Sequence, residues 1–248
     1  IYGSRAANGV IVITTKKGQE GAMHIDLDIK QGFTTIAPNN FSFCNAQQTA
    51  DLYAQGLVNS NPEKYTYESA MAKIKSDYNW DGIQNYDWID AITRTGYYQD
   101  YNLSFSGGNG KTRYYASVGY LNQEGVAINS GMKRYSARLN LETSYKWFSF
   151  GFNTSFALAD MDAFSQSTGG SYSNPFVGGT LKATPLDPFY NADGSYNTGI
   201  MYNPLAVYDE DEGDIYNTKT TTINLNPYFA INFGQGFILK TSLGLNSY

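Results

Sequence analysis

The sequence predicts an all-β chain that forms part of an antiparallel transmembrane β-barrel, with about seven strands of a larger barrel. Three observations predict it: apolar residues alternate with polar ones, the alternating stretches are long, and short connections alternate with long ones. A soluble strand averages about 5–6 residues, whereas a tilted membrane-spanning strand needs about 9–11. Outer-membrane barrels have short turns at one end and longer loops at the other.

The composition supports this class and excludes others. Among 248 residues there are 22 Tyr, 14 Phe and 25 Gly, and the net charge is −5. This net charge argues against a nucleic-acid-binding protein, which would need a basic surface. A single Cys and a single His exclude an internal disulfide and a Cys-rich or His-rich metal site. We therefore expect no cofactor, no metal and no catalytic set, and the chain is not predicted to be an enzyme.

The first 18 residues follow a different pattern from the rest. Asn8 and Gly9 form a strong turn signal, because both residue types tolerate positive φ. Residues 10–15 (VIVITT) are apolar and β-branched without alternation, which is typical of a strand covered on both faces. We predict that residues 1–18 are the end of a small globular domain and that 19–248 belong to the barrel.

Alternation with a period of two begins at residue 23. In the stretch around Arg138, for example, Leu139 and Leu141 share one face, and Arg138, Asn140 and Glu142 share the other. The predicted strands are 23–32, 97–107, 112–123, 133–145, 147–159, 217–233 and 236–247. Because bacterial single-chain barrels use an even number of strands and at least eight, we expect the barrel to need further strands.

The connections between the predicted strands alternate between short and long. The short ones are the sequence GGNGK, a turn around Lys146 and the sequence GQG. The long ones are about 33–96, 124–132 and 160–216, and we expect them outside the cell. The first long loop should be partly helical, because Ala46, Ala50 and Leu57 recur at helical spacing and Asn45 can cap the helix.

Aromatic residues lie at several predicted strand ends. Tyr145, Trp147 and Phe148 flank one short turn, and Phe233 and Phe237 flank another. Such rings fit the aromatic girdle of a membrane barrel. Ordinary cross-strand packing of aromatic pairs is the alternative.

The opening YGSRAANGVIVITTKKG resembles the end of the plug domain in SusC/RagA-family TonB-dependent receptors of the outer membrane. The motif residues are Tyr2, Gly3, Ser4, Arg5, Asn8 and Gly9. Further similarity follows over residues 87–142, and the resemblance covers nearly the whole chain. It implies a plug end followed by about the first third of a barrel of about 22 strands.

The resemblance also implies a function and partners. It implies active import across the cell outer membrane of a Gram-negative, Bacteroides-type bacterium, with an oligosaccharide or a peptide as substrate. TonB would supply energy through a segment that this sequence lacks, a SusD-like lipoprotein would cap the barrel, and outer-membrane lipid would surround it. A plug strand is buried on both faces, which explains why residues 10–15 do not alternate.

Two groups of residues are candidate sites. Arg138, Asn140 and Glu142 should face the lumen, where they contact the plug or line the substrate path, with plug contact favoured. Four tyrosines of the last long loop suit binding of sugar or peptide, loop packing or contact with a capping lipoprotein, and the sequence leaves these alternatives open. They are Tyr190, Tyr196, Tyr202 and Tyr208; Tyr172 lies in the same loop.

The remaining features have simpler interpretations. His24 is expected at a lumen or interface position, and Cys44 near a helix start. The acidic run from Asp209 to Glu212 matches no defined Ca²⁺ loop and is expected to be solvated. The competing hypothesis is a soluble carbohydrate-binding β-sandwich, whose apolar faces would fold inward in two sheets, whereas a barrel points them outward in one continuous sheet.

Overall fold

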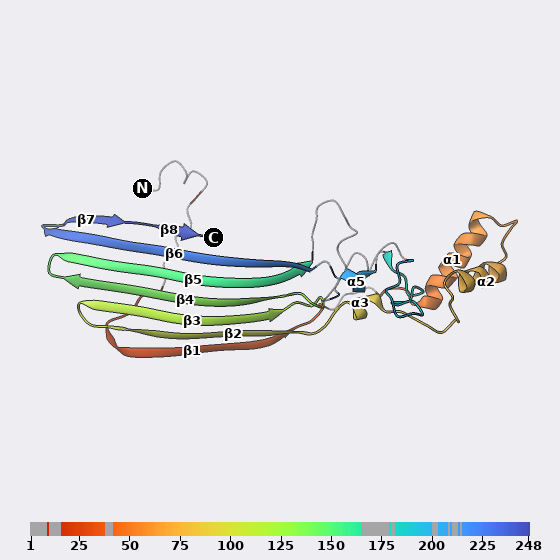
Figure 1. Ribbon diagram of the computed structural model, residues 1–248, viewed down its shortest axis with the longest axis horizontal. Helices are drawn as coiled ribbons and strands as arrows, with labels where there is room; N and C mark the ends of the chain where they lie inside the picture. The colour runs from red at the N-terminus through yellow and green to blue at the C-terminus, as the bar shows by residue number, and fades with distance from the viewer. Residues whose placement is uncertain are drawn as a thin grey trace.

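The prediction of an all-β chain is confirmed. The computed structural model describes residues 9, 16–37, 42–164, 179, 182–199, 203–207, 209, 213 and 215–248. In this part of the chain eight strands form one antiparallel sheet, in the order β1-β2-β3-β4-β5-β6-β7, and β8 also pairs with β6 (Figure 1).

The strands lie close to the predicted positions and are mostly longer. Their bounds are β1 Gly21–Thr34, β2 Gly96–Gly108, β3 Thr112–Glu124, β4 Gly131–Tyr145, β5 Phe148–Phe164, β6 Ile215–Gly234, β7 Phe237–Ser242 and β8 Leu245–Ser247. Six of them have 13 or more residues, which is well beyond the average soluble strand. The helices are α1 Ala46–Ser60, α2 Tyr67–Asp77, α3 Trp88–Ala91 and α5 Pro204–Val207.

Each strand up to β7 pairs with its neighbour in sequence, so the sheet is a simple meander. The described residues form a single continuous sheet rather than two facing sheets. The β-sandwich hypothesis is therefore wrong, because nothing in this arrangement buries the apolar faces of two sheets against each other.

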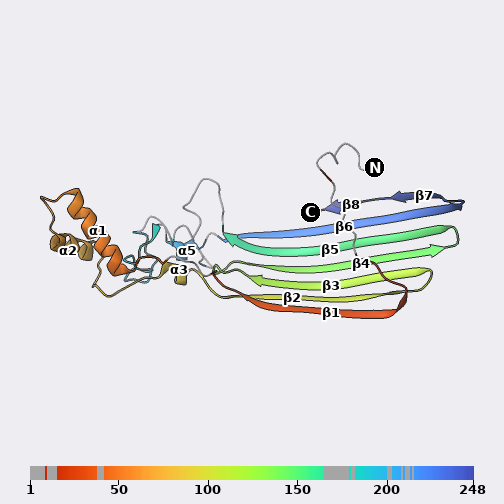
Figure 2. The ribbon, with the colours of Figure 1, turned by 180° about the vertical axis from the view of Figure 1, so that it is seen from behind.

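The three short turns meet at one end of the sheet, as predicted (Figures 1 and 2). Lys146 has φ 52°, and Gly234 has φ 83°, so both turns use the left-handed backbone conformation that tight hairpins need. In the turn between β2 and β3, the Asn109 side-chain oxygen accepts hydrogen bonds from the backbone N–H groups of Lys111 and Thr112.

One strand prediction needs correction. The stretch 236–247 is not one strand, because residues 243 and 244 separate β7 from β8. The cause lies opposite, at Pro227 of β6: its carbonyl accepts a bond from Leu243 N at 3.0 Å, but proline has no N–H to return the second bond. The ladder is therefore interrupted at that position.

The long connections fold together at the other end of the sheet, beyond the strands (Figure 1). The predicted helices in the first loop are confirmed, and Asn45 caps α1 in a capping box with Gln48. A core joins α1 and α2 to the last long loop through Ala50, Ile74 and Leu186. A second core adds the short loop after β3: Ile92 packs on Ala127, with Leu205 against them. We call this assembly of residues 42–94, 124–131, 182–199 and 203–207 the outer unit.

Within the described residues no helix is long and apolar enough to cross a membrane.

Most of the plug-end motif lies outside the described residues, including Tyr2, Gly3, Ser4, Arg5 and Asn8. Residues 10–15 lie outside them too. Gly9 is described and has φ 106°, a conformation that glycine adopts readily. The predicted turn also needs Asn8, so it stays a prediction. The division into a plug end at 1–18 and a barrel at 19–248 stays a prediction.

Candidate functional site

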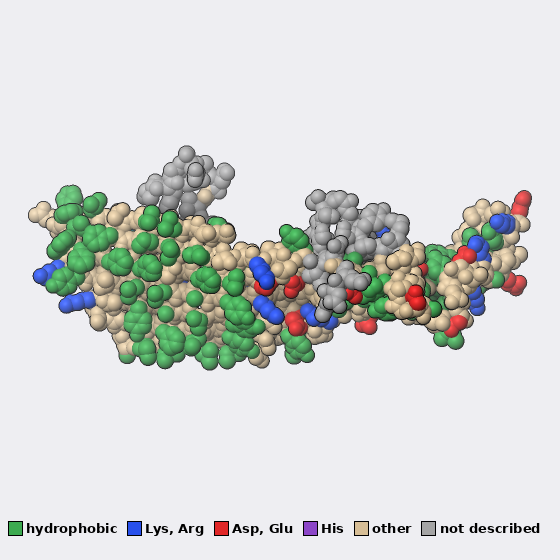
Figure 3. Space-filling model, viewed as in Figure 1, with side chains coloured by type: hydrophobic (Ala, Val, Ile, Leu, Met, Phe, Trp, Pro, Cys, Tyr) green, Lys and Arg blue, Asp and Glu red, His purple; other side chains and the backbone are tan. Residues whose placement is uncertain are grey.

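The two faces of the sheet differ in chemistry. Cross-strand partners point to the same face, so each row of paired residues can be followed across the sheet. One central row is apolar on each of the strands β1 to β6: Leu27, Leu103, Val118, Ala137, Phe156 and Ile223. We call this side the outer face, and it is covered with hydrophobic side chains (Figure 3).

Aromatic and charged rows bound the apolar area of the outer face. Toward the outer unit, Tyr101, Tyr120 and Tyr135 are neighbours, with ring centroids 6.3 and 5.2 Å apart. The next row outward is polar or charged throughout: Gln31, Gln99, Asn122, Lys133, Asp160 and Lys219. At the opposite end, Tyr145 packs on Phe148 and Phe148 on Phe229. The apolar area is thus a band with an aromatic border at each end.

The opposite side, which we call the inner face, is polar. Its central rows carry small and hydrogen-bonding side chains: Asp26, Ser104, Ser117, Arg138, Ser155 and Asn224 in one, and His24, Ser106, Tyr115, Asn140, Asn153 and Asn226 in the next. The predicted residues Arg138, Asn140 and Glu142 lie on this face, at alternate positions of β4.

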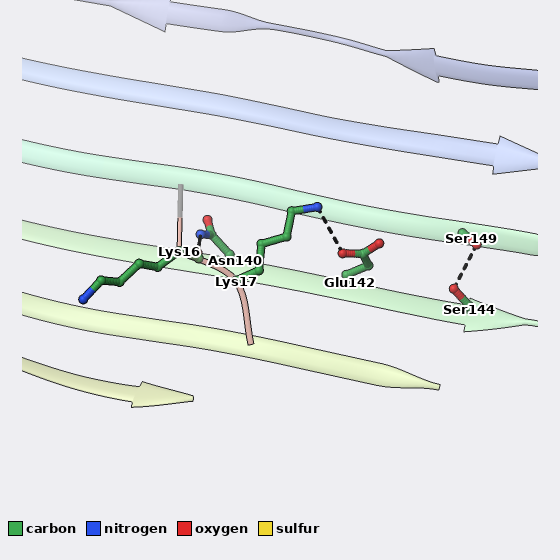
Figure 4. A network of polar contacts seen from close by, with 6 residues as sticks. All are labelled: Lys16, Lys17, Asn140, Glu142, Ser144 and Ser149. Carbon is green, nitrogen blue, oxygen red and sulfur yellow. Dashed lines mark hydrogen bonds and ion pairs between the residues drawn. The ribbon is translucent and has the colours of Figure 1, made fainter. Parts of the chain in front are cut away.

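The segment 16–18 lies across the inner face and contacts two of these three residues (Figure 4). Asn140 is only 5% exposed, and its side-chain Nδ2 donates to the Lys16 carbonyl at 2.6 Å. Lys17 Nζ lies 3.4 Å from a carboxylate oxygen of Glu142. Arg138 makes no such contact in the described residues; it lines a cavity of about 580 Å³ between the segment and the sheet.

Gly18 fixes how closely the segment approaches. A Cβ atom at Gly18 would lie 2.2 Å from the backbone oxygen of Tyr114 and 2.7 Å from that of Gly107. No side chain fits between the segment and the β2–β3 backbone, so glycine is required for this contact.

A second glycine shapes the wall beside Glu142. Glu142, Gly151 and Tyr228 occupy one rung of the sheet on β4, β5 and β6. The Tyr228 ring covers Gly151 so closely that a Cβ there would lie 1.8 Å from a ring carbon. Because β5 contributes no side chain at this point, Tyr228 reaches across it toward Glu142. Lys240 Nζ lies over the ring as well, 4.1 Å from its centroid.

The tyrosine candidates of the last long loop fall into two groups. Tyr190 and Tyr196 form an isolated antiparallel bridge, with their rings 5.4 Å apart. The Tyr196 hydroxyl donates to Asp209, whereas Tyr190 is 48% exposed. Tyr172, Tyr202 and Tyr208 lie outside the described residues.

The other singled-out residues have ordinary surroundings. His24 is exposed, and its Nε2 lies 3.0 Å from Asp26. Cys44 is exposed next to the α1 cap. No group of three or more potential metal ligands occurs among the described residues. Of the acidic run, only Asp209 is described, and Glu212 lies outside.

The partners of these candidate residues lie far from them in the sequence. Lys16, Lys17 and Gly18 follow the predicted strand 10–15, and nothing in their sequence pairs them with Asn140 or Glu142. The pairing of Gly151 with Tyr228 depends on the register of two strands far apart in sequence. A register model built from the alternation and the turn positions would have placed them on one rung.

Comparison with known proteins identifies the family. No family model matches the chain. TonB-dependent receptor P3 of Formosa agariphila is 32% identical over 254 residues, covering 100% of this chain and 23% of that protein. TonB-dependent receptor SusC of Bacteroides thetaiotaomicron is 31% identical over 196 residues, covering 79% of this chain and 17% of that protein. The chain belongs to the TonB-dependent receptors.

Solved structures agree with this family. The RagAB peptide importer in its closed-closed state matches with a TM-score of 0.74 and 25% identity, over 99% of this chain and 30% of that one. The open-open state matches with a TM-score of 0.68 and 26% identity, again over 99% and 30%. The sheet of this receptor chain therefore corresponds to part of a TonB-dependent receptor barrel. The chain spans less than a quarter of the length of the curated relatives it matches.

Proposed function

We propose that the chain forms part of the wall of an importer that moves a nutrient across the bacterial outer membrane. The observation that carries this proposal is the two-faced continuous sheet. Its outer face is an apolar band with aromatic borders, and its inner face is polar and holds the segment 16–18. This is the arrangement of a barrel wall between lipid and a plugged lumen.

The dimensions of the band support a membrane position. Along β4 the band runs from Tyr135 to Tyr145, both about half exposed. Roughly ten residues at about 3.3 Å each give about 33 Å along the strand. With a strand tilt of about 45° this becomes about 23 Å across the membrane, close to the roughly 25 Å apolar height of outer-membrane barrels.

The inner face supports a role in holding a plug. In this proposal Asn140 and Glu142 are wall residues that anchor the chain where it leaves the plug, and Arg138 lines the space beside it. The buried Asn140–Lys16 hydrogen bond is the main anchor. The Lys17–Glu142 pair adds little, because exposed ion pairs contribute about 0–1 kcal/mol.

We infer the partners and the class of cargo from the likeness to this family. We infer energy input from TonB through a segment outside this sequence, and a SusD-like lipoprotein over the outer unit. The similar RagAB structures are described as a peptide importer or a peptide transporter, and one curated relative is named TonB-dependent receptor SusC. The cargo proposed here is an oligosaccharide or a peptide.

Uptake measurements in cells test the import function. The full-length gene is deleted and restored in its own host, and uptake of fluorescent peptide and oligosaccharide pools is compared. Import predicts that uptake of one pool is lost on deletion, returns on restoration and stops when TonB is removed. Uptake of both pools unchanged in the deletion strain would refute it.

A matched pair of variants tests the plug anchor. Asn140→Ala leaves the Lys16 carbonyl without its partner, and an unsatisfied buried group costs about 1–3 kcal/mol. Asn153→Ala removes the same side chain from the paired position on β5, which makes no hydrogen bond to Lys16. In the full-length protein we expect faster trypsin cleavage after Lys16 and Lys17 for Asn140→Ala alone. Equal cleavage of both variants would contradict the anchor.

A further inference from the structure

The outer unit contains an aromatic cavity that the import proposal does not use. It has a volume of about 810 Å³ and lies between α1, α2 and the segment 182–199. Its lining includes five aromatic residues, a buried carboxylate and one cation: Tyr53, Tyr78, Trp80, Tyr86, Tyr190, Asp187 and Lys182. A volume of this size is within the range of small-ligand sites.

Asp187 is the distinctive group in this cavity. It is only 7% exposed. One carboxylate oxygen, Oδ2, accepts hydrogen bonds from the Thr184 backbone N–H at 2.8 Å and the Thr184 hydroxyl at 2.7 Å. The other, Oδ1, accepts no hydrogen bond from any described residue, and no described cation forms an ion pair with the carboxylate. A buried carboxylate with an unpaired oxygen is costly.

The fold needs an acceptor at this position, not a charge. An Asn side-chain oxygen accepts the same two bonds from Thr184, and it avoids the burial of a negative charge. Burial raises the pKa of the Asp187 carboxyl, because it disfavours the negatively charged form. A charged residue at a site where a neutral one would serve the fold points to a binding role.

The surroundings favour a positive ligand. Aromatic ring faces attract cations, and the ring of Tyr86 is held by an edge contact with Phe189 at 5.2 Å. The rings of Tyr53 and Tyr78 lie 6.2 Å apart. Burial is the largest cause that raises the pKa of Tyr78 to about 12, and the neighbouring Tyr53 and Asp187 are the next largest. The Tyr78 hydroxyl therefore stays neutral beside the carboxylate.

We propose that this cavity binds an organic cation, an ammonium or guanidinium group such as that of a Lys or Arg side chain. Asp187 Oδ1 is the anionic partner, and the surrounding tyrosine rings contact the charged group and its apolar stem. Ligand binding in this cavity can be measured without transport, so the proposal is tested independently of the proposed import function.

The cavity provides its own control. Asp77 lines it as well, but that carboxylate is about half exposed and is paired with Lys73 at 2.8 Å on α2. Its charge is therefore already compensated, and it should contribute little to ligand binding. Asp77→Asn and Asp187→Asn make the same chemical change at the two positions.

Calorimetry on the purified full-length protein tests the proposal. The probe is the blocked tripeptide acetyl-Gly-Arg-Gly-amide, and the same peptide with citrulline, which is neutral and nearly isosteric, is the ligand control. We expect the Arg peptide to bind at least about tenfold more tightly than the citrulline peptide, as loss of a charge-assisted bond predicts. Asp187→Asn should weaken the Arg peptide by a similar factor, and Asp77→Asn should change it by less than about twofold.

Several results would overturn the proposal. No measurable binding of the Arg peptide, or equal binding of the Arg and citrulline peptides, would do so without any variant. Unchanged affinity of a folded Asp187→Asn protein would also do so, with folding checked by its melting temperature. Binding of the neutral disaccharide maltose in place of the Arg peptide would assign the cavity to sugar instead.

Discussion

Replacing Leu139 by Lys tests which face of the sheet meets lipid. Leu139 is 41% exposed on the outer face of β4, and its neighbour Arg138 is a natural cation on the inner face. The Leu139→Lys side chain therefore enters the apolar band, whereas Arg138→Lys keeps a positive charge on the polar side. The two variants carry the same new residue at adjacent positions.

The depth of Leu139 sets the expected magnitude. It lies four residues from Tyr135, or about 13 Å along the strand, which a tilt of about 45° reduces to about 9 Å below the aromatic border. The half-thickness of the band is about 12 Å, so Leu139 is within a few Å of the midplane. A Lys near the midplane of a membrane barrel costs about 2–4 kcal/mol. Arg138→Lys should cost well under about 1 kcal/mol, because lumen-facing positions are wet and polar.

Two assays on the full-length protein separate lipid exposure from simple core burial. Unfolding by urea in lipid vesicles gives the stability difference, with Leu139→Ala as a control for lost side-chain volume. For the second assay a thiol-reactive fluorophore is attached to the Leu139→Cys or the Arg138→Cys variant, each combined with Cys44→Ser to remove the exposed native thiol. A lipid-embedded quencher should quench the fluorophore on Leu139→Cys and leave the one on Arg138→Cys unaffected.

Two outcomes would refute the membrane assignment of β4. One is equal quenching at both positions, and the other is equal stability of the two Lys variants. Asn140 is not a suitable control for either assay, because it is buried against Lys16.

Three further variants are expected to report on close contacts and on charge. Gly18→Ala should push the segment 16–18 off the Tyr114 backbone and speed trypsin cleavage there; unchanged cleavage would contradict the contact. Gly151→Ala should destabilise the wall by about 1–3 kcal/mol in the same urea assay, and Tyr228→Ala in the same chain should relieve most of it. Because the pKa of Asp187 is raised in the folded state, the protonated carboxyl favours folding. This stabilisation is present at low pH and is lost as pH rises through the raised pKa. Hydrogen exchange in α1 measured against pH should show this loss in the native protein and not in Asp187→Asn.

The repeating features of the fold could be predicted from the sequence. Alternation with a period of two gives the faces of β4 directly, and the positions of Lys146 and Gly234 give the turns. The one misjudged strand, 236–247, breaks because of Pro227 on a different strand. The residues next to 243 and 244 in the sequence do not indicate this break. Predicting it requires knowing that Pro227 of β6 lies opposite.

The candidate site shows the same limit more strongly. Alternation places Asn140 and Glu142 on the inner face, but the partner of Asn140 is a backbone carbonyl 124 residues away. A backbone group has no side chain that could mark it in the sequence. The sequence does not reveal the roles of Gly18 and Gly151 either. Each is needed because other atoms occupy the space that a side chain would fill. The wall could thus be predicted from periodic patterns, whereas the contacts that hold a segment against it depend on register, close approach and missing side chains, which only the folded arrangement brings together.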